Sequence, residues 1–405
     1  MPRTRKTGEG GLYYDKNRDL WIASVDIGFD KDGKRKQKRV SSRSQTIARK
    51  KLDALKLEID NHGSPLGNQT VAEWGVSWLD DFKHKKPQTY RTYASLLKTW
   101  VNPIIGRKNL KEVRPSDLKR IYDSMRAAGK STSTSRKVHQ MLSGLFESAR
   151  KDRLVSYNVV KDVTPPSAAK SARNAFTREQ TAAIIHASSM FRDGTKWAVS
   201  LKAGIRQGER LGATVDAVDL RTGLFMVKWS LVEGNYDHGC GGTCSAKAAG
   251  HCPQKYLLVP DGMDYRVLKG RLMLVPPKSG EARTFPLTVE LYAHLEKHLA
   301  QMGDRPNPFG LLWPAEDGSP MTARQDQAEW RALLQVAGID HPEATTHWAR
   351  HTAISEMTSS GAADRTIGEI VGHKSPGVTG RYQHTSNLDA LEALNRAEGR
   401  LQIES

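Results

Sequence analysis

The stretch "TTHWARHTAISEM" (residues 345–357) gathers two histidines and an arginine into a short run. His347 and Arg350 lie three positions apart, so they share one face if the segment is helical. His351 follows Arg350 directly. Histidine changes its charge near neutral pH, whereas arginine stays cationic. This helix is therefore a candidate for proton transfer beside an anion.

A second stretch lies just downstream. "VGHKSPGVTGRYQH" (371–384) places His373 nine positions before Tyr382. Taken alone, it predicts a surface loop with an ordinary tyrosine. The phenol has an ordinary pKa of about 10, which neighbouring guanidinium groups such as that of Arg381 would lower. A tyrosine with a lowered pKa can attack phosphorus and hold it covalently.

Two upstream stretches supply complementary groups. "LKAGIRQGERLGA" (201–213) places Arg206 and Glu209 at helical spacing between apolar residues. "LMLVPPKSGEARTFPL" (272–287) predicts a β-hairpin whose turn presents Lys278. Two arginines can hold the non-bridging oxygens of a phosphodiester and stabilise its transition state. A lysine can protonate the leaving alkoxide. This chemistry requires no carboxylate cluster and no magnesium, so no catalytic cofactor is expected.

Together, in this order, the four stretches resemble the tyrosine recombinases, and among them the phage-type integrases. The resemblance implies a 3′-phosphotyrosyl intermediate on Tyr382, a freed 5′-hydroxyl that Lys278 protonates, and strand exchange without ATP through a Holliday junction. The implied catalytic residues are Arg206, Lys278, His347, Arg350, His373 and the nucleophile Tyr382, with Glu209 and His351 in support.

Composition favours a nucleic-acid partner. The chain has 405 residues and a formal net charge of +18, with a pI of about 9.7. Such a balance suits a polyanion, and double-stranded DNA is the first candidate. No apolar run approaches the roughly 20 residues of a membrane span. The charged N-terminal stretch "MPRTRKTGEGG" is not followed by an apolar h-region, so we expect no secretory signal. We therefore expect a cytoplasmic, nucleoid-associated protein of a bacterial host, without membrane contact.

Residues 1–51 carry 15 Lys and Arg against 6 Asp and Glu. Period-two alternation between residues 9 and 40 predicts three short strands, with a hairpin turn at Asp32–Gly33, and a helix follows. A solvated basic tail is the alternative, but Tyr13, Tyr14 and Trp21 argue against disorder. A basic sheet of this size can enter a major groove. Its candidate DNA-binding residues are Lys34, Arg35, Lys36, Lys38 and Arg39.

An all-helical segment follows. Thr70 and Glu73 predict a capping box at its first helix. The run "KSTSTSRK" (130–137) combines hydroxyl groups with Arg136 and Lys137, which suits phosphate contacts. A charged helix face that is only solvated is the ordinary alternative. Pro165-Pro166 then lies in a second linker (156–174), and Thr177 and Gln180 predict another cap.

The predicted fold class is multidomain: a small N-terminal three-stranded β-sheet plus helix, an all-α domain, and a mixed α+β, mainly helical catalytic domain of the tyrosine recombinase type. We place these domains at 1–62, 68–155 and 174–405. The resemblance implies that they bind arm-type sites, bind core sites and catalyse, respectively. It also implies a homotetramer on DNA, with a host DNA-bending protein and an excisionase as further partners. The helical tail (386–405) packs on its own domain or docks on a neighbouring protomer.

An insertion at about 233–270 contains all three cysteines: Cys240, Cys244 and Cys252. Three thiolates and one imidazole form a closed tetrahedral zinc site. His238 and His251 compete for the fourth position, and His238 is favoured because His251 adjoins Cys252. Three free thiols in a glycine-rich loop are the alternative. Any such zinc would be structural.

Other functions share part of this pattern. A chromosome- or plasmid-resolving recombinase uses the same residues, and a type IB topoisomerase uses similar chemistry without strand exchange. A DNA-binding regulator would explain the charge but not the arginine, lysine, histidine and tyrosine set.

Overall fold

The computed structural model describes residues 11–29, 35–62, 69–167, 175–303, 305–372 and 387–402. The chain divides into two compact units, 1–170 and 171–405, which are described separately. Three of the predictions lie outside the described residues: His373, Tyr382 and the Asp32–Gly33 turn with Lys34. Among the described helices, none is long and apolar enough to cross a bilayer.

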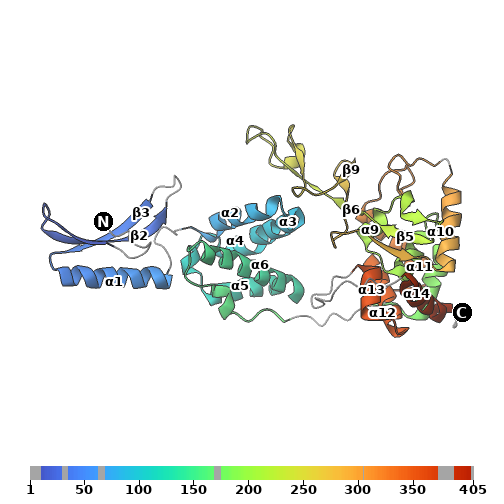
Figure 1. The fold of residues 1–405 in the computed structure, drawn as a ribbon, viewed down its shortest axis with the longest axis horizontal. Coiled ribbons are helices and arrows are strands. Elements are labelled where there is room, and N and C mark those ends of the chain that lie inside the picture. The colour runs from blue at the N-terminus through green and yellow to red at the C-terminus, as the bar shows by residue number, and fades with distance from the viewer. Residues whose placement is uncertain are drawn as a thin grey trace. The chain divides into compact units, whose positions relative to one another are not determined.

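The first unit begins with an antiparallel sheet of β1 (Gly11–Asp15), β2 (Leu20–Phe29) and β3 (Arg35–Ser42), in that order. Helix α1 (Gln45–His62) packs on this sheet (Figure 1). Ala23 and Val25 pack with Leu52 and Leu55 in a small core. The predicted three strands and one helix are confirmed.

The rest of the first unit is helical. It comprises α2 (Val71–Lys83), α3 (Pro87–Leu96), a π-helical turn (Leu97–Val101), α4 (Asn102–Ile105), α5 (Pro115–Ala127), α6 (Thr132–Lys151), and 3₁₀ turns at Leu110–Glu112 and Val159–Asp162. The predicted capping box opens α2, because the Glu73 amide donates to Thr70 Oγ1 at 3.2 Å and the Thr70 amide donates to Glu73 Oε2 at 2.9 Å. One apolar core joins these helices.

The second unit is mixed. Its helices are α7 (Arg178–Ser188), α8 (Thr195–Ala203), α9 (Gln207–Leu211), α10 (Val289–Met302), α11 (Ala323–Val336), α12 (Thr346–Ser359), α13 (Asp364–Val371) and α14 (Asn387–Gln402). Its strands are β4 (Val218–Asp219), β5 (Leu224–Val227), β6 (Ser230–Glu233), β7 (Asn235–Asp237), β8 (Tyr256–Leu258), β9 (Arg266–Lys269), β10 (Leu272–Val275) and β11 (Arg283–Pro286). Short 3₁₀ turns lie at Val215–Ala217 and Ala249–His251.

These strands form three small sheets, of order β6-β10-β9, β11-β5-β4 and β7-β8. The predicted hairpin over 272–287 is wrong, because β10 pairs with β6 and β9 whereas β11 pairs with β5. The hairpin partner of β10 is the preceding strand β9, and Gly270 takes the positive φ of 58° in the turn between them. Lys278 lies in the loop that connects two different sheets.

Helix α14 packs within its own unit. Ala390, Ala393, Leu394 and Ala397 join the largest core of the unit, against α12, α13 and β11. Its buried Glu398 pairs with the buried Lys202 of α8. The described part of the tail therefore packs on its own domain, and docking on a neighbouring protomer stays a prediction, because one chain alone does not test it.

Candidate active site

Arg206 lies where the chain turns between α8 and α9. Gly204 ends α8 with φ +65°, and a Cβ there would approach the Ala353 and Val371 side chains to 3.2 and 3.1 Å. Arg206 is the N-cap of α9 and Glu209 its third residue, and the Glu209 carboxylate accepts two hydrogen bonds from Arg206. The Arg206 amide donates to Glu209 Oε2 at 3.0 Å, and its guanidinium donates to Oε1 at 2.7 Å. Arg206 and Glu209 therefore have the predicted three-residue spacing, because one is the cap of the helix and the other lies in its first turn.

Glu209 is the buried carboxylate at the centre of the site, with 2% of its surface exposed. It also accepts two hydrogen bonds from Arg283 of β11, at 3.1 and 2.7 Å. Burial alone would raise the pKa of the Glu209 carboxyl. Hydrogen bonds and charge from Arg283 and Arg206 outweigh burial and lower this pKa to about 2. Glu209 is thus ionised and holds both arginines in place.

Sequence reasoning missed Arg283. It lies in the same quoted stretch as Lys278, at the first position of the short strand β11, and its neighbours in the sequence do not mark it as part of a site. Its Nε donates to the carbonyl of Ile370 at 2.9 Å, at the end of α13. Gly372 follows with φ +71°, and a Cβ there would lie 2.8 Å from the Arg283 guanidinium carbon. Only glycine fits beside this arginine.

Arg350 is buried on α12, with 2% exposed. One terminal nitrogen donates to the carbonyl of Gly204 at 2.6 Å. The other, Nη2, is buried and has no hydrogen-bond partner among the described residues. Burial makes the largest contribution and lowers the pKa of Arg350. The charges of Arg206 and Arg283 lower this pKa further, whereas the charge of Glu209 raises it, and the resulting pKa is about 9. Three guanidinium groups therefore surround one carboxylate, and the excess positive charge fits an anion.

His347 and His351 lie beside Arg350 on α12, as the sequence predicts. Their rings are 4.6 Å apart, edge to face. Partial burial lowers the pKa of His347, and the charges of His351, Arg350 and Arg206 lower it further. The neutral ring can accept a proton. Both histidines and Arg350 line a cavity of about 460 Å³ along α12. Lys278 is exposed on the loop between β10 and β11, and none of the described hydrogen bonds or ion pairs joins it to Arg206, His347 or Arg350.

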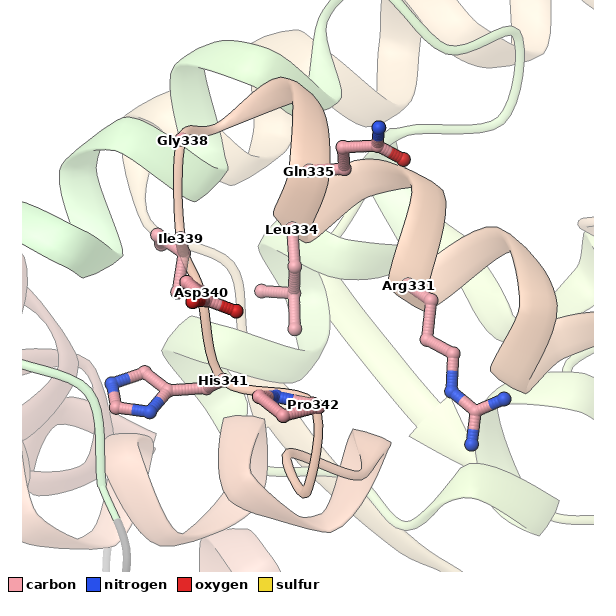
Figure 2. Close-up of a pocket in the computed structure, with 8 residues that line it drawn as sticks. All are labelled: Arg331, Leu334, Gln335, Gly338, Ile339, Asp340, His341 and Pro342. Carbon is pink, nitrogen blue, oxygen red and sulfur yellow. The ribbon is translucent and has the colours of Figure 1, made fainter.

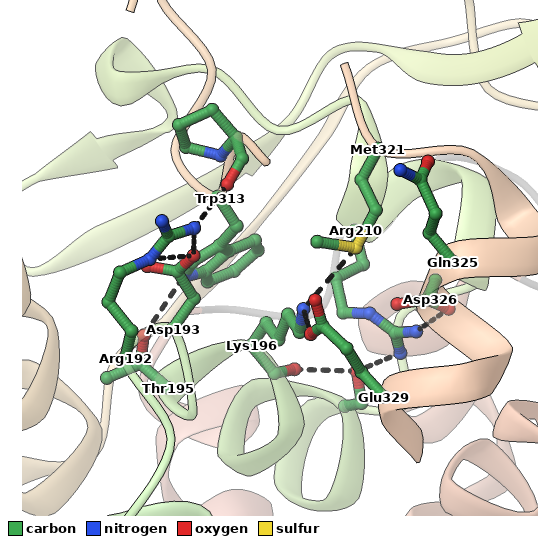
Figure 3. Close-up of polar contacts among 12 residues, drawn as sticks. Arg192, Asp193, Thr195, Lys196, Arg210, Trp313, Met321, Gln325, Asp326 and Glu329 are labelled. Atoms are coloured by element: carbon green, nitrogen blue, oxygen red, sulfur yellow. Dashed lines mark hydrogen bonds and ion pairs between the residues drawn. The ribbon is translucent and has the colours of Figure 1, made fainter. Parts of the chain in front are cut away.

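A buried ionic network fixes α9 and thereby Arg206 (Figure 3). Arg210 donates to Asp326 of α11 at 2.6 Å and to Ser200 of α8 at 2.7 Å, with its guanidinium 4.3 Å from the centre of the Trp197 ring. Gln207 donates to the same Asp326 oxygen at 2.6 Å. A buried charge pair with these extra hydrogen bonds holds one geometry. The first turn of α9 is therefore locked to two neighbouring helices.

A second cavity lies at the end of α11 (Figure 2). Its lining comes from α11 and the loop after it: Arg331, Leu334, Gln335, Gly338, Ile339, Asp340, His341 and Pro342. None of the predicted catalytic residues that the structure describes lines this cavity, so we do not assign the reaction there.

The candidate DNA-binding residues are distributed over two elements of the first unit. Arg136 and Lys137 are exposed on the first turns of α6. Lys38 pairs with Val25 and Arg39 with Ser24 across β2 and β3. Because Val25 belongs to the core under α1, Lys38 lies on the helix-covered face and Arg39 on the opposite face. Arg35 and Lys36 belong to β3, and only their backbone is described.

The predicted zinc ligands gather in the segment between β7 and β8. One ligand atom from each of His238, Cys240, Cys244 and Cys252 lies within 4.8 Å of the others. His251 is outside this group.

Comparison with family models gives two matches. Residues 262–388 match the phage integrase family, and residues 70–126 match the phage integrase N-terminal SAM-like domain. An integrase of Saccharopolyspora erythraea is 25% identical over 97% of this chain and 98% of its own length. An integrase of Streptomyces ambofaciens is 27% identical over 94% of this chain and 92% of its own.

Solved structures have the same fold. The Tn1549 transposon integrase in complex with transposon right end DNA superposes with a TM-score of 0.59 at 20% identity, over 83% of this chain and 100% of that one. A lambda integrase tetramer bound to a Holliday junction gives 0.54 at 13% identity, over 95% and 99%. The predicted fold class is confirmed by these matches.

Proposed function

Because the chain belongs to the phage integrase family of tyrosine recombinases, we propose that it integrates and excises a phage or another integrative mobile element by cutting and rejoining DNA at specific sites. Both full-length relatives compared above are integrases, which supports this substrate over a chromosome-dimer site. The basic three-stranded sheet before the helical segment supports it as well, since a second DNA-binding module suits arm-type sites.

The observation that carries the proposal is the buried Nη2 of Arg350, which has no hydrogen-bond partner within the part of the chain that the structure describes. A buried N–H donor without an acceptor is costly, so such a group in a native site calls for a missing partner. Arg206, Arg283 and Arg350 surround a single carboxylate, Glu209. The missing partner is thus an anion, and the scissile phosphate of DNA supplies both the charge and the acceptor oxygens.

In the proposed reaction, the Tyr382 hydroxyl attacks phosphorus. A Tyr382–phosphorus ester forms and the bond to the 5′ oxygen breaks, with its electron pair leaving on that oxygen. Lys278 protonates the leaving oxygen, and neutral His347 assists removal of the tyrosine proton. Arg206 and Arg350 hold the phosphate oxygens, and His373 orients them. The 5′-hydroxyl of the partner strand then attacks the same phosphorus and releases Tyr382.

The proposed assembly is a homotetramer on paired core sites, since two rounds of exchange need two pairs of active sites. The lambda integrase tetramer on a Holliday junction offers the precedent. Double-stranded DNA at core and arm sites is the proposed partner. A host DNA-bending protein and an excisionase would bring arm and core sites together and choose the direction, and the protein would act in the bacterial nucleoid.

The test uses a nicked duplex carrying the recombination site of the element, which traps the covalent intermediate because the short strand diffuses away. We expect a protein–DNA adduct on a denaturing gel with the wild type and with Tyr265→Phe, a control at an exposed tyrosine elsewhere. Tyr382→Phe should bind the same DNA and form no adduct. If the wild type binds the site without forming an adduct, the proposed covalent reaction is wrong, and a DNA-binding regulator becomes the favoured function.

Exchange between two sites is the second readout. A product with exchanged flanks distinguishes a recombinase from a topoisomerase, which reseals the original strand. Binding should weaken steeply with added salt in every variant, because phosphate contacts release counterions.

A further inference from the structure

We propose that the lobe between β7 and β8 holds one structural zinc ion through His238, Cys240, Cys244 and Cys252. The donor atoms of these four residues lie within 4.8 Å of one another. His238 Nδ1 is 3.3 Å from Cys244 Sγ and 4.0 Å from Cys240 Sγ. A tetrahedral zinc with ordinary bond lengths separates a nitrogen and a sulfur ligand by about 3.6 Å. The observed distances bracket this value, so the fit needs only small adjustments.

Two tight turns bring the ligands together. Between Cys240 and Cys244, Gly241 and Gly242 both have positive φ, at 60° and 88°, which other residues adopt only with strain. The Thr243 amide and hydroxyl both donate to the Cys240 carbonyl, at 3.2 and 2.7 Å. Around Cys252, its own amide donates to the Ala249 carbonyl at 3.0 Å and the Lys255 amide donates back to Cys252 at 3.2 Å. Each turn points its thiols inward.

Close backbone contact joins the two turns. A Cβ at Gly239 would lie 2.2 Å from the Gln254 carbonyl oxygen, so any larger residue would push the turns apart. Cys240 and Cys252 are buried, at 8% and 2% exposed. The three cysteines are free rather than disulfide-bonded, so three thiols face one imidazole. Buried thiols at this density are typical of a metal centre.

The lobe has little else to hold it together. Its sheet consists of two strands of three residues each, and no residue of 235–258 belongs to any of the five apolar core clusters of the described chain. A segment this small cannot bury enough apolar surface to order itself, and a metal is a common substitute for a core. Zinc would therefore supply the folding free energy of the lobe.

The role is structural. Four protein ligands close the tetrahedron and leave no position for water or substrate. A DNA-binding role is not favoured, because residues 233–258 balance Glu233 and Asp237 with Lys247 and Lys255. Three thiolates with one zinc ion would add a further negative charge. The lobe thus extends the β6-β10-β9 sheet at Gly234, whose amide donates to the Arg271 carbonyl at 2.8 Å.

The test measures zinc in the full-length protein purified without chelators, by native mass spectrometry and elemental analysis. We expect about one zinc per chain. Cys252→Ser and His238→Ala should retain less than half of it after dialysis against a competing chelator. His251→Ala is the matched control, because it changes the residue next to Cys252 but lies outside the group, and it should retain the metal.

Cobalt gives an independent readout of the ligands. Co²⁺ in place of zinc should show tetrahedral visible bands and sulfur-to-metal charge transfer in wild type and in His251→Ala, and both should weaken in His238→Ala. Removal of the metal should speed tryptic cleavage after Lys247 and Lys255, and leave formation of the Tyr382–DNA adduct intact. A folded wild type that binds neither zinc nor cobalt would overturn the proposal, as would equal metal loss in the two histidine variants.

Discussion

The arginine cluster (Arg206, Arg283 and Arg350) and the cysteine cluster (Cys240, Cys244 and Cys252 with His238) each bring polar side chains together, but different parts of the structure do so. Arg206 and Arg350 lie 144 positions apart in the chain, whereas His238 and Cys252 lie within a stretch of 15. The arginines converge because apolar cores bring α8 and α12 together and the ionic network of Arg210 fixes α9 beside them. The cysteines converge through two local turns, in a lobe without a core cluster. A core can thus position polar groups over long range, and the zinc that we propose would position the thiols where no core cluster exists.

The two clusters also differ in the charge of the partner that each would bind. Three guanidinium groups around Glu209 leave an excess positive charge, which an anion would balance. Three thiols and an imidazole call for a cation. In our proposals, the anion would be exchanged in every reaction and the zinc ion would be resident. The following substitutions and a chelation experiment test the anion and the cation separately, and the experiment with the strongest predicted change comes first.

Replacing Arg350 should have the largest effect on activity. Arg350→Ala removes the buried donors assigned to the phosphate, so the rate of adduct formation should fall by about 10²–10³-fold or more. Stability should not fall in proportion, because the variant also relieves repulsion with Arg206 and Arg283. Arg331→Ala, on the exposed side of α11, is the control and should retain the rate. A similar loss in both variants would contradict the assignment of the phosphate site.

Neutralising Glu209 should mainly affect stability. Its folded-state pKa of about 2 lies below the ordinary 4.5, so its stabilisation is present above about pH 4.5 and is lost as pH falls toward 2. That shift corresponds to about 3 kcal/mol. Glu209→Gln should lower the urea midpoint at pH 7 and flatten the acid dependence in this window. Glu316→Gln, at an exposed position, should do neither. An unchanged midpoint in Glu209→Gln would mean that the carboxylate does not hold the arginines.

Chelation should have a local effect. Amides of residues 235–258 should exchange their hydrogens faster after metal removal, because the lobe has no core cluster of its own. Amides of α8 and α9 should stay protected, since their contacts are apolar and ionic. Exchange measured by mass spectrometry on wild type and Cys252→Ser, each with and without chelator, tests this difference. Loss of protection in α9 would show that the two clusters are coupled.

The smallest effect concerns His351. Its charge lowers the pKa of His347, so His351→Ala should raise that pKa toward the ordinary value. Since neutral His347 is the proton acceptor in the proposed reaction, the acid limb of the rate profile should move to higher pH. Titration of the His347 ring by NMR gives the pKa directly. A downward shift would show that the contact between the rings, rather than charge, sets the value.

Local features of the fold were predictable from the sequence. The capping boxes at Thr70 and Thr177 and the helix at 346–359 follow from spacing alone, because helical bonds join near neighbours. Strand partners were not predictable. The hairpin predicted over 272–287 failed because the insertion supplies β9 as the neighbour of β10, and alternation cannot identify a partner.

The candidate sites also have features that the sequence predicted and features that it did not. The four residues of the proposed zinc site could be found from their clustering in the sequence, and the structure gathers His238 rather than His251 with the three cysteines. Metal binding itself stays a prediction. The roles of Arg206, Lys278, His347 and Arg350 came from resemblance. Arg283 was missed because its importance arises from a long-range contact with Glu209. Two arginines that bond to one glutamate from distant elements leave no periodic pattern in the sequence. The catalytic roles, the DNA-contacting residues and the three domain boundaries stay predictions, and His373 and Tyr382 lie outside the described residues.

The anchoring of the chain on both sides of Tyr382 has a consequence for kinetics. Gly372 accepts a hydrogen bond from Arg206 at 2.8 Å, and α14 begins at Asn387 and packs into the core of the same unit. Tyr382 is ten positions after the first anchor and five before the second, which limits its reach to about 35 Å and about 17 Å, respectively. If Tyr382 is the nucleophile, as we propose, it is tethered by its own chain to the unit that holds Arg350, and its attack within one protomer would be a unimolecular step whose rate is independent of protein concentration once DNA is bound.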